Sequence, residues 1–317
     1  MCVRVPAKVN LFLAVRGVRS DGYHELSTIM QTVSVHDKLT AGLYGADLAS
    51  MHPTARQWMQ VDLAVEEGAP GDVPAGTDNL VMQAADALMA RVGMGGNGTS
   101  RPDDGPGTSL RLTKSIPVAA GMAGGSADAA AALVLLNRLW DCQLSDRELR
   151  DLAADLGADV PFCVTGGTAL ATGTGAATAR VLTMGTYHWV VGVTDAPLST
   201  PEVYRAFDAH SEPSEVEPDA VLAALRTGDA EALGAALYND LELAAMGLRP
   251  DLGLKLEAMR DASVLGTVVS GSGPTVVGLV ASAEEAVRVA AAVEGSFDRV
   301  LVATSPAGGP EVSRLRA

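Results

Sequence analysis

A glycine-rich turn set directly against an alanine-rich run is the part of this sequence that points most clearly to chemistry. The stretch "IPVAAGMAGGSADAAAALVLLN", residues 116–137, places Gly121, Gly124 and Gly125 just before a segment rich in alanine and leucine. Glycines let consecutive backbone N–H groups curl around an anion, and a following helix aims its unpaired N–H groups and positive dipole end at the same point. The pattern therefore indicates a phosphate-binding loop, followed by a helix that opens at Ser126, whose hydroxyl either caps the helix or binds phosphate.

The same segment has a plainer interpretation and lacks the usual nucleotide fingerprints. It contains neither the GKS or GKT of a Walker loop nor a GxGxxG motif. A simple strand-to-helix connection would also use glycines in a tight turn. The spacing of the glycines alone thus favours a phosphate-binding site but does not indicate which nucleotide would bind. The residues assigned to this site are Pro117, Val118, Ala119, Ala120, Gly121, Met122, Ala123, Gly124, Gly125, Ser126 and Ala127.

An unusual lysine lies on an apolar strand near the N-terminus. The alternation in "VRVPAKVNLFLAVRG" predicts a strand with Lys8, Asn10 and Phe12 on one face and Leu13 on the other. The chain has only four lysines, and a lysine buried without a partner would be costly. Lys8 is therefore either an edge-strand residue that faces water or a functional one, with Asn10 beside it.

Composition and charge exclude several classes of partner. The 317 residues are 48% apolar with a mean hydropathy of +0.20, which predicts an ordinary globular protein large enough for two cores. Acidic residues outnumber basic ones by 38 to 23, and the resulting charge of −15 repels nucleic acid and anionic membranes. We expect neither as a partner, and an anionic substrate would need a local cationic pocket.

No targeting or metal-binding pattern is apparent. The longest apolar run near the N-terminus, Leu11 to Val15, is too short for a signal sequence, and no apolar segment approaches the roughly 20 residues that span a bilayer. Cys2, Cys142 and Cys163 have no paired spacing, and the five histidines form no HExxH motif. We expect a cytoplasmic protein whose cysteines are free thiols without a functional role. The sequence does not indicate the oligomeric state.

Strands and helices alternate along the chain. After a turn at Asp21-Gly22, a second strand is expected over residues 27–43, and residues 93–107 are expected to form a mobile surface loop. Ser145 and Glu148 form a capping box. Helices are expected over residues 77–93, 144–157, 220–225, 230–245 and 282–294, and further strands over 109–116, 187–194, 266–280 (with a glycine turn) and 299–307. Because the first two strands look antiparallel, we predict an α+β protein with two domains, residues 1–165 and 166–317.

The glycine segment resembles the phosphate-binding motif of the GHMP kinases, the family of galactokinase, homoserine kinase, mevalonate kinase and phosphomevalonate kinase. It departs from the common motif at Ala119, Ala123 and Ala127, where glycine, glycine and serine are usual. The first two alanines stiffen the loop. The third removes one hydroxyl and leaves Ser126 as the phosphate-side hydroxyl.

Two other stretches resemble one branch of that family. "PAKVNLFLAVRGVRSDGYHEL" and "VVSGSGPTVVGL" are similar to the first and third motifs of the kinases that phosphorylate 4-diphosphocytidyl-2-C-methyl-D-erythritol in the non-mevalonate isoprenoid pathway. "DNLV", "LGADVPF" and "NDLE" fit in the same order, so the resemblance covers nearly the whole chain. It implies two α+β domains with the active site in the cleft between them.

The resemblance also implies roles for the charged residues. Asp159 in "GADVP" would be the general base, although an Asp before Val-Pro is also a natural helix N-cap. Lys8 would pair with Asp159 and stabilise charge on the attacking oxygen. Asn10 would bind a substrate hydroxyl or the base.

The remaining roles concern the substrate and the nucleotide. Tyr23 would stack on cytosine and His24 would read its polar edge, with Tyr204 completing a sandwich; a polar hairpin tip is the alternative for the first two. Lys114 and Asn79 would lie near the adenine and ribose. The second glycine turn would line the cleft near the phosphates and the substrate, through Ser270, Gly271, Ser272 and Gly273.

The implied activity is the transfer of a phosphoryl group from ATP, with Mg²⁺, to the 2-hydroxyl of 4-diphosphocytidyl-2-C-methyl-D-erythritol. Magnesium neutralises the triphosphate, and Ser126 is the candidate side chain for it. The alternatives are another small-molecule GHMP kinase, such as a homoserine or mevalonate kinase, and a nucleotide-binding member that has lost catalysis. The Tyr23-His24 pair argues against the first, and the presence of both Lys8 and Asp159 argues against the second.

Overall fold

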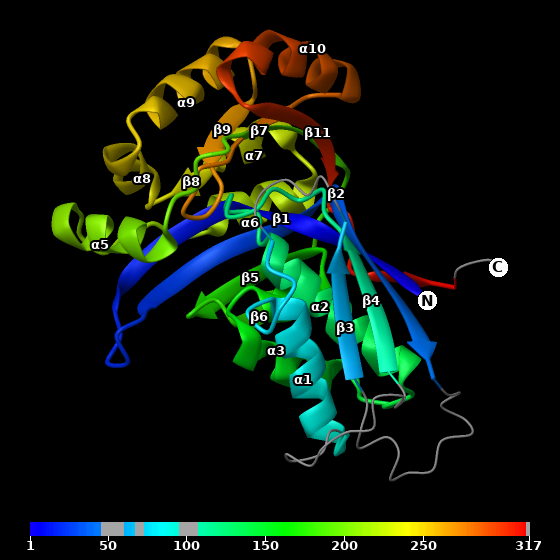
Figure 1. Cartoon of the computed structure of the whole chain (residues 1–317). Coiled ribbons are helices and arrows are strands. Elements are labelled where there is room, and N and C mark those ends of the chain that lie inside the picture. Colours follow the sequence, from blue (N-terminus) through cyan, green and yellow to red (C-terminus); the bar gives the residue numbers. More distant parts are fainter. Residues whose placement is uncertain (46–59, 67–72, 95–106, 315–317) are drawn as a thin grey trace.

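Two β-sheets form the framework of the part of the chain that the structure describes (Figure 1). The computed structural model describes residues 1–45, 60–66, 73–94 and 107–314. The first sheet has the order β12-β1-β2-β4-β3, with β5 and β6 joined to it through β2 and β8 through β1. Its strands are β1 (Cys2–Val18), β2 (His24–Tyr44), β3 (Gln60–Val65), β4 (Gly107–Thr113), β5 (Thr168–Gly173), β6 (Ala177–Arg180), β8 (Tyr238–Asn239) and β12 (Glu311–Ser313).

The long antiparallel hairpin of β1 and β2 carries the N-terminal motif. The turn predicted at Asp21-Gly22 is confirmed, and Gly22 supplies its positive φ of 83°. In Figure 1 the hairpin tip (blue) extends beyond the body of the sheet, below α5 (Thr200–His210). The register shifts between Asn10 and Phe12, so Leu11 is the extra residue of a bulge. The strict alternation predicted for this strand is therefore wrong: Leu13, and not Phe12, lines the same cavity as Asn10.

Helices rich in alanine and leucine cover the first sheet. α2 (Gly124–Leu139) packs on β1 and β2 and also against α1 (Leu80–Val92) and α4 (Val160–Thr165). Its alanines are fully buried because a methyl side chain lets the helix approach the sheet and its neighbours closely. The predicted capping box of α3 (Asp146–Leu156) is confirmed.

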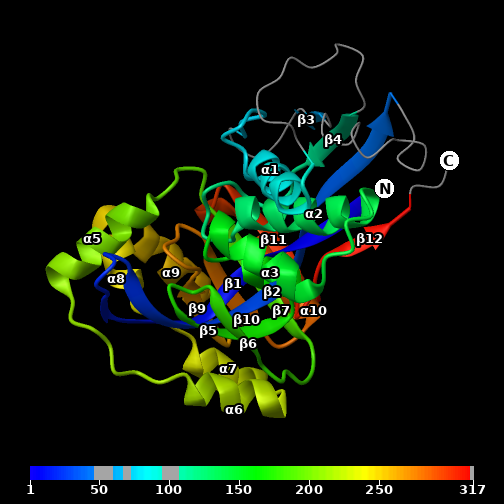
Figure 2. The ribbon, with the colours of Figure 1, turned by 90° about the horizontal axis from the view of Figure 1, so that it is seen from below.

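The second sheet is antiparallel throughout, in the order β11-β7-β10-β9. Helices pack on both of its faces, so β7 and β10 are buried on both sides, and their sequences are nearly continuous runs of apolar residues. α9 and α10 lie outside this sheet at the top of Figure 1, and Figure 2 shows α6 and α7 on the far side of the molecule from α1. The bounds are β7 (Tyr187–Val193), β9 (Gly266–Val269), β10 (Val276–Val280), β11 (Arg299–Ser305), α6 (Asp219–Thr227), α7 (Ala230–Ala236), α8 (Glu242–Leu248), α9 (Asp251–Asp261), α10 (Ala283–Val293) and a 3₁₀ turn at Glu294–Ser296.

Two expectations differ from the structure. The helix expected over residues 230–245 is two helices, α7 and α8, because β8 between them pairs with β1 and Asn239 accepts the N–H of Leu241. The boundary expected after residue 165 would separate β5 and β6 from the sheet to which they are hydrogen-bonded; the chain passes to the second sheet between Arg180 and Tyr187. Later, β12 returns to the first sheet.

The surface loop expected over residues 93–107 lies mostly outside the described residues. In the described part of the chain, no helix combines the length and the apolar character needed to cross a bilayer.

Candidate active site

A cavity of about 770 Å³ brings most of the predicted site residues together. Its walls come from the β1–β2 hairpin, the loop before α2, the residue before α4, helix α5 and the turn after β9. We call residues 117–127 the phosphate loop and residues 270–273 the second glycine turn. The predicted residues that line the cavity are Lys8, Asn10, Tyr23, His24, Ala119, Ala120, Gly121, Ala123, Gly124, Gly125, Ser126, Asp159, Tyr204, Gly271, Ser272 and Gly273.

Other predicted residues lie behind this surface. Met122 is buried, and its carbonyl accepts the N–H of Lys8 at 3.2 Å. Ser270 is fully buried, and its hydroxyl donates to the carbonyl of Gly121 at 3.0 Å. Pro117, Val118 and Ala127 belong to the loop but do not line the cavity.

Lys8 is a buried lysine with two partners. The residue is 5% exposed, and its Nζ donates to Asn10 Oδ1 at 2.6 Å and lies 3.4 Å from Asp159 Oδ2. Asn10 is oriented in turn by donating from Nδ2 to Thr28 Oγ1 at 2.8 Å. Lys8 is therefore not an edge-strand lysine facing water.

Asp159 directly precedes α4, at the N-cap position of that helix. Its side chain makes no capping hydrogen bond, and instead its Oδ2 faces Lys8. The side chain is 34% exposed and lines the cavity, so one carboxylate is open to a ligand while its charge is balanced by a buried ammonium. A carboxylate held in this way can accept a proton from a hydroxyl group placed in the cavity.

The phosphate loop presents an uncapped helix N-terminus to the cavity. α2 begins at Gly124 rather than at the expected Ser126, and its N-cap is Ala123, which supplies no side-chain hydrogen bond. No acidic residue lies in the first turn. The unpaired N–H groups and the positive end of this 16-residue helix therefore favour an anion.

Backbone conformation and close contacts explain why position 121 of the loop is glycine. A Cβ at Gly121 would lie 2.1 Å from the carbonyl oxygen of Ser270, and the φ of Gly121 is +75°. Ala119 and Ala123 have φ values of 51° and 56°, the left-handed region that usually favours glycine. The structure thus gives the two alanines the conformation that glycine adopts easily, at some cost in strain.

The second glycine turn is held by residues to which no role had been assigned. Asn239 donates from Nδ2 to the carbonyls of Val269 (2.8 Å) and Gly271 (2.7 Å). Thr200 and Ser272 share a hydroxyl–hydroxyl hydrogen bond of 2.8 Å. "NDLE" was part of the matched pattern, but nothing in the sequence showed what Asn239 contacts.

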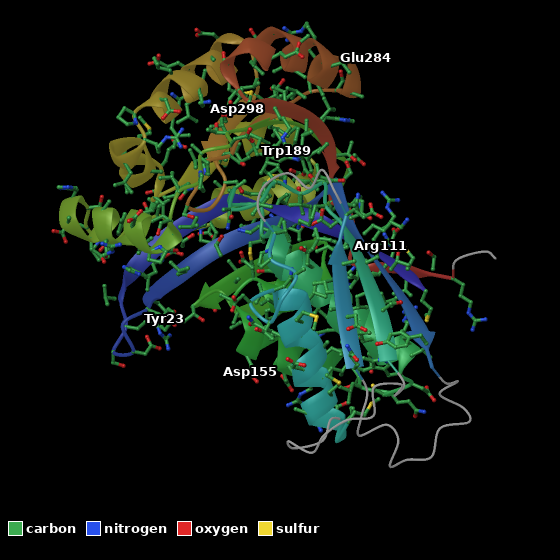
Figure 3. All side chains as sticks on the ribbon, in the orientation of Figure 1. Tyr23, Arg111, Asp155, Trp189, Glu284 and Asp298 are labelled. Carbon is green, nitrogen blue, oxygen red and sulfur yellow. The ribbon has the colours of Figure 1, made fainter. Side chains whose placement is uncertain are left out.

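At the other end of the cavity, the hairpin meets α5. The rings of His24 and Tyr204 stack at 4.5 Å, and His24 Nε2 lies 2.7 Å from Asp208 Oδ1. Tyr23 at the hairpin tip is 67% exposed (Figure 3). Burial, with the nearby Asp159 charge, raises the pKa of Tyr204 well above its usual value. The ring of Tyr204 thus packs on that of His24, and Asp208 is a further polar residue at this end of the cavity.

The two residues expected near adenine and ribose do not line the cavity. Asn79 caps α1 by accepting the N–H of Val81 at 2.8 Å. Lys114 is buried in an ion-pair cluster with Asp37 and Asp128. Within the residues that the structure describes, no group of three or more His, Cys, Asp or Glu side chains could hold a metal ion.

Comparison with known proteins identifies the family. The family model of the GHMP kinases N terminal domain matches residues 79–167, and that of the GHMP kinases C terminal domain matches residues 221–299. A 4-diphosphocytidyl-2-C-methyl-D-erythritol kinase from a Nocardioides species is 46% identical over 97% of this chain and 98% of its own. One from Mycobacterium tuberculosis is 44% identical over 98% of this chain and 92% of its own.

Solved structures of GHMP kinases share the fold of this chain. A crystal structure of 4-(cytidine 5'-diphospho)-2C-methyl-D-erythritol kinase superposes with a TM-score of 0.76 and 32% identity, covering 96% of this chain and 98% of the other. A homoserine kinase from Cytophaga hutchinsonii has a TM-score of 0.72 at 19% identity, over 98% and 96% of the two chains, and shares the fold. The chain therefore belongs to the GHMP kinase family, among its 4-diphosphocytidyl-2-C-methyl-D-erythritol kinases.

Proposed function

We propose that this protein transfers the γ-phosphoryl group of ATP to the 2-hydroxyl of 4-diphosphocytidyl-2-C-methyl-D-erythritol, a step in making isoprenoid precursors. The observation that carries the proposal is the Lys8–Asp159 ion pair, with 3.4 Å between Nζ and Oδ2, in the same cavity as the N-terminus of α2. Phosphoryl transfer depends on positioning and charge neutralisation, and these two features supply both.

Asp159 is the proposed general base. Its Oδ atoms accept the proton of the 2-hydroxyl as the alcohol oxygen attacks the γ-phosphorus, and ADP leaves from the opposite side. Lys8 stabilises the negative charge that develops on the attacking oxygen. Asn10 holds the Lys8 ammonium by its 2.6 Å hydrogen bond.

The phosphate loop and α2 are the proposed site for the triphosphate. Backbone N–H groups at the uncapped start of α2 would bind phosphate oxygens, and Ser126 would add a hydroxyl. A magnesium ion fits the site, because Mg²⁺ needs only one or two protein oxygens besides phosphates and water, and both Ser126 and Asp159 line the cavity. When bound, magnesium neutralises charge on the transferred phosphoryl group.

The hairpin end is the proposed cytidine site. Tyr23 is exposed and free to stack on a base, while His24 is held by Tyr204 and Asp208 so that its ring can contact a base edge. The cavity volume of about 770 Å³ is in the usual range for a small-molecule site. We further propose that the enzyme acts in the cytoplasm.

A substrate panel tests the proposal. The purified protein would be given ATP and magnesium with 4-diphosphocytidyl-2-C-methyl-D-erythritol, mevalonate, homoserine or galactose, and the products would be read by mass. We expect one added phosphate on the cytidylyl compound alone. Transfer to another acceptor would contradict the cytidine site, and ATP binding without transfer to any acceptor would favour a non-catalytic member of the family.

A further inference from the structure

A buried cluster of three ionisable side chains lies beneath the phosphate loop, outside the cavity. Lys114 follows β4, Asp37 lies on β2 and Asp128 lies in the second turn of α2. Their side chains are only 2%, 0% and 5% exposed, respectively. The reaction proposed above uses none of them, yet burying charge is unfavourable unless partners compensate the lost hydration.

Asp37 fixes the chain where it enters the phosphate loop. Its Oδ1 accepts the N–H groups of Ser115 at 2.6 Å and Ile116 at 2.8 Å, and its Oδ2 accepts a hydrogen bond from Lys114 Nζ. Ile116 directly precedes Pro117. The carboxylate therefore sets the path by which the backbone leaves β4 and enters the loop.

Lys114 connects this entry point to the helix at the other end of the loop. Its Nζ also donates to Asp128 Oδ2 at 2.7 Å. A Cβ at Gly124 would lie 3.2 Å from the same Nζ, so the ammonium reaches the underside of the first residue of α2. The phosphate loop is thus attached at its entry through Asp37 and at its exit through Asp128.

The two carboxyl groups are not equivalent. Asp37 accepts three hydrogen bonds, whereas Asp128 accepts one and its Oδ1 is buried with no hydrogen-bond partner among the described residues. Two carboxylates around one ammonium would leave a net negative charge beneath a triphosphate site. Burial raises the pKa of Asp128 well above its usual value, and the Asp37 charge adds to this although Lys114 opposes it.

We infer that Asp37, Lys114 and Asp128 are positioning residues that clamp the phosphate loop to β2 and α2, and that Asp128 takes part as a neutral carboxylic acid. The cluster then carries no net charge, and Asp128 still accepts the hydrogen bond from Lys114. The inference rests on the proposed function in one respect, namely that ATP is the anion that the loop binds.

Three variants test the clamp: Asp128→Asn, Asp37→Asn and Lys114→Met. Matched controls on exposed positions are Asp155→Asn on α3 and Lys38→Met, next to Asp37 on β2. The measurements are the dissociation constant of a non-hydrolysable ATP analogue by calorimetry, KM for both substrates, and Tm.

We expect Asp128→Asn to bind the ATP analogue within about threefold of wild type, because the amide keeps the shape and the neutral charge. Asp37→Asn and Lys114→Met should weaken ATP binding by about tenfold or more, since each removes the Asp37–Lys114 ion pair that connects the entry of the loop to α2, while KM for the cytidylyl substrate changes by less than about twofold. If Lys114→Met does not fold, the double variant Asp37→Asn/Lys114→Met, which removes both charges of the pair, is measured in the same way and should show the same loss.

Two results would overturn the inference. A loss of ATP affinity in Asp128→Asn as large as that in Asp37→Asn would show that Asp128 acts as a carboxylate. Equal rises of both KM values, or a lower Tm with unchanged ATP affinity, would show a general structural role. A wild-type protein that binds the ATP analogue but phosphorylates none of the panel would contradict the proposed function, while the calorimetric comparison would still decide the clamp.

Discussion

At the scale of single residues, the proposed chemistry depends on one carboxylate whose side chain is not used for helix capping. Replacing Asp159 with Asn keeps the shape but removes the proton acceptor. We expect Asp159→Asn to lower kcat by about 10² to 10⁴, the usual contribution of a general base, and to leave ATP binding nearly unchanged. Steady-state kinetics and calorimetry check this. The exposed Asp155 on α3 (Figure 3) gives a control, Asp155→Asn, which should keep full activity. A kcat for Asp159→Asn within a few-fold of wild type would remove Asp159 as the base.

Asp128 should make stability depend on pH in a direction opposite to that of most carboxyl groups. Its pKa is higher in the folded chain than in the unfolded chain, so the folded state binds the proton more tightly. The free energy of unfolding therefore decreases as pH rises from the unfolded value, about 4, up to the raised folded value. Asp128→Asn cannot titrate, so the Tm of wild type should fall relative to that of the variant across this window. Thermal unfolding at a fixed ionic strength measures the difference, and a difference independent of pH would contradict the raised pKa.

At the scale of elements, the start of α2 combines a functional position with an unfavourable backbone. Ala123 is the N-cap, has a φ of 56° and makes no capping bond with its side chain. Glycine adopts this conformation without the Cβ conflict and is also the better N-cap. We expect Ala123→Gly to raise the free energy of unfolding by about 1 kcal/mol, measured by urea denaturation. Ala120→Gly, at a buried loop position without a positive φ, should lower it. A loss of stability in both variants would show that Ala123 is not strained.

The β1–β2 hairpin and α5 form the proposed cytidine end, and they offer a test that separates binding from folding. Tyr23 is 67% exposed, so its removal should hardly change Tm. If its ring stacks on cytosine, Tyr23→Ala should raise KM for the cytidylyl substrate by about tenfold, the order of one stacking contact, with little effect on KM for ATP. Tyr23→Phe keeps the ring and serves as the control that should resemble wild type. Equal effects on the two KM values would make the ring structural.

At the scale of the whole molecule, the two glycine turns hold the parts of the cavity together. The phosphate loop leads into and includes the start of α2, which packs on the first sheet, and the second glycine turn connects two strands of the second sheet. The Ser270 hydroxyl bonds the Gly121 carbonyl, and a Cβ at Gly121 would lie 2.1 Å from the Ser270 carbonyl oxygen. The cavity therefore depends on the close approach of these two turns.

Gly121→Ala tests that approach. An alanine at this position would have to adopt a positive φ, and its methyl group would overlap the backbone of Ser270. We therefore expect the free energy of unfolding to fall by more than about 2 kcal/mol. Gly125→Ala is the matched control, because this position is helical and its Cβ would meet only the flexible side chain of Leu80 at 3.3 Å. The control should be neutral or stabilising, and urea denaturation compares the two. Similar stability of Gly121→Ala and wild type would mean that the two turns can separate without loss.

Local patterns in the sequence were sufficient for most elements and for the chemical identity of the site. The capping box of α3, the hairpin turn at Gly22 and the strand–turn–strand of residues 266–280 depend on neighbouring residues, and all three are confirmed. The glycine segment and the "PAKVNL" and "DGYHEL" stretches indicated the family because phosphate and substrate contacts are concentrated in short continuous runs.

Contacts between distant residues could be decided only by the tertiary structure. The bulge at Leu11, which brings Leu13 to the cavity, depends on the register with β2, and the break after α7 depends on pairing with β1. His24 meets Asp208 across 184 positions, and Lys114 meets Asp37 across 77. Periodicity and spacing report only what lies within a few residues along the chain. Which carboxylate faces His24 or the buried Lys114 is set by how strands and helices pack. The sequence by itself therefore determined the family and its motifs, and the packing decided which side chains support them.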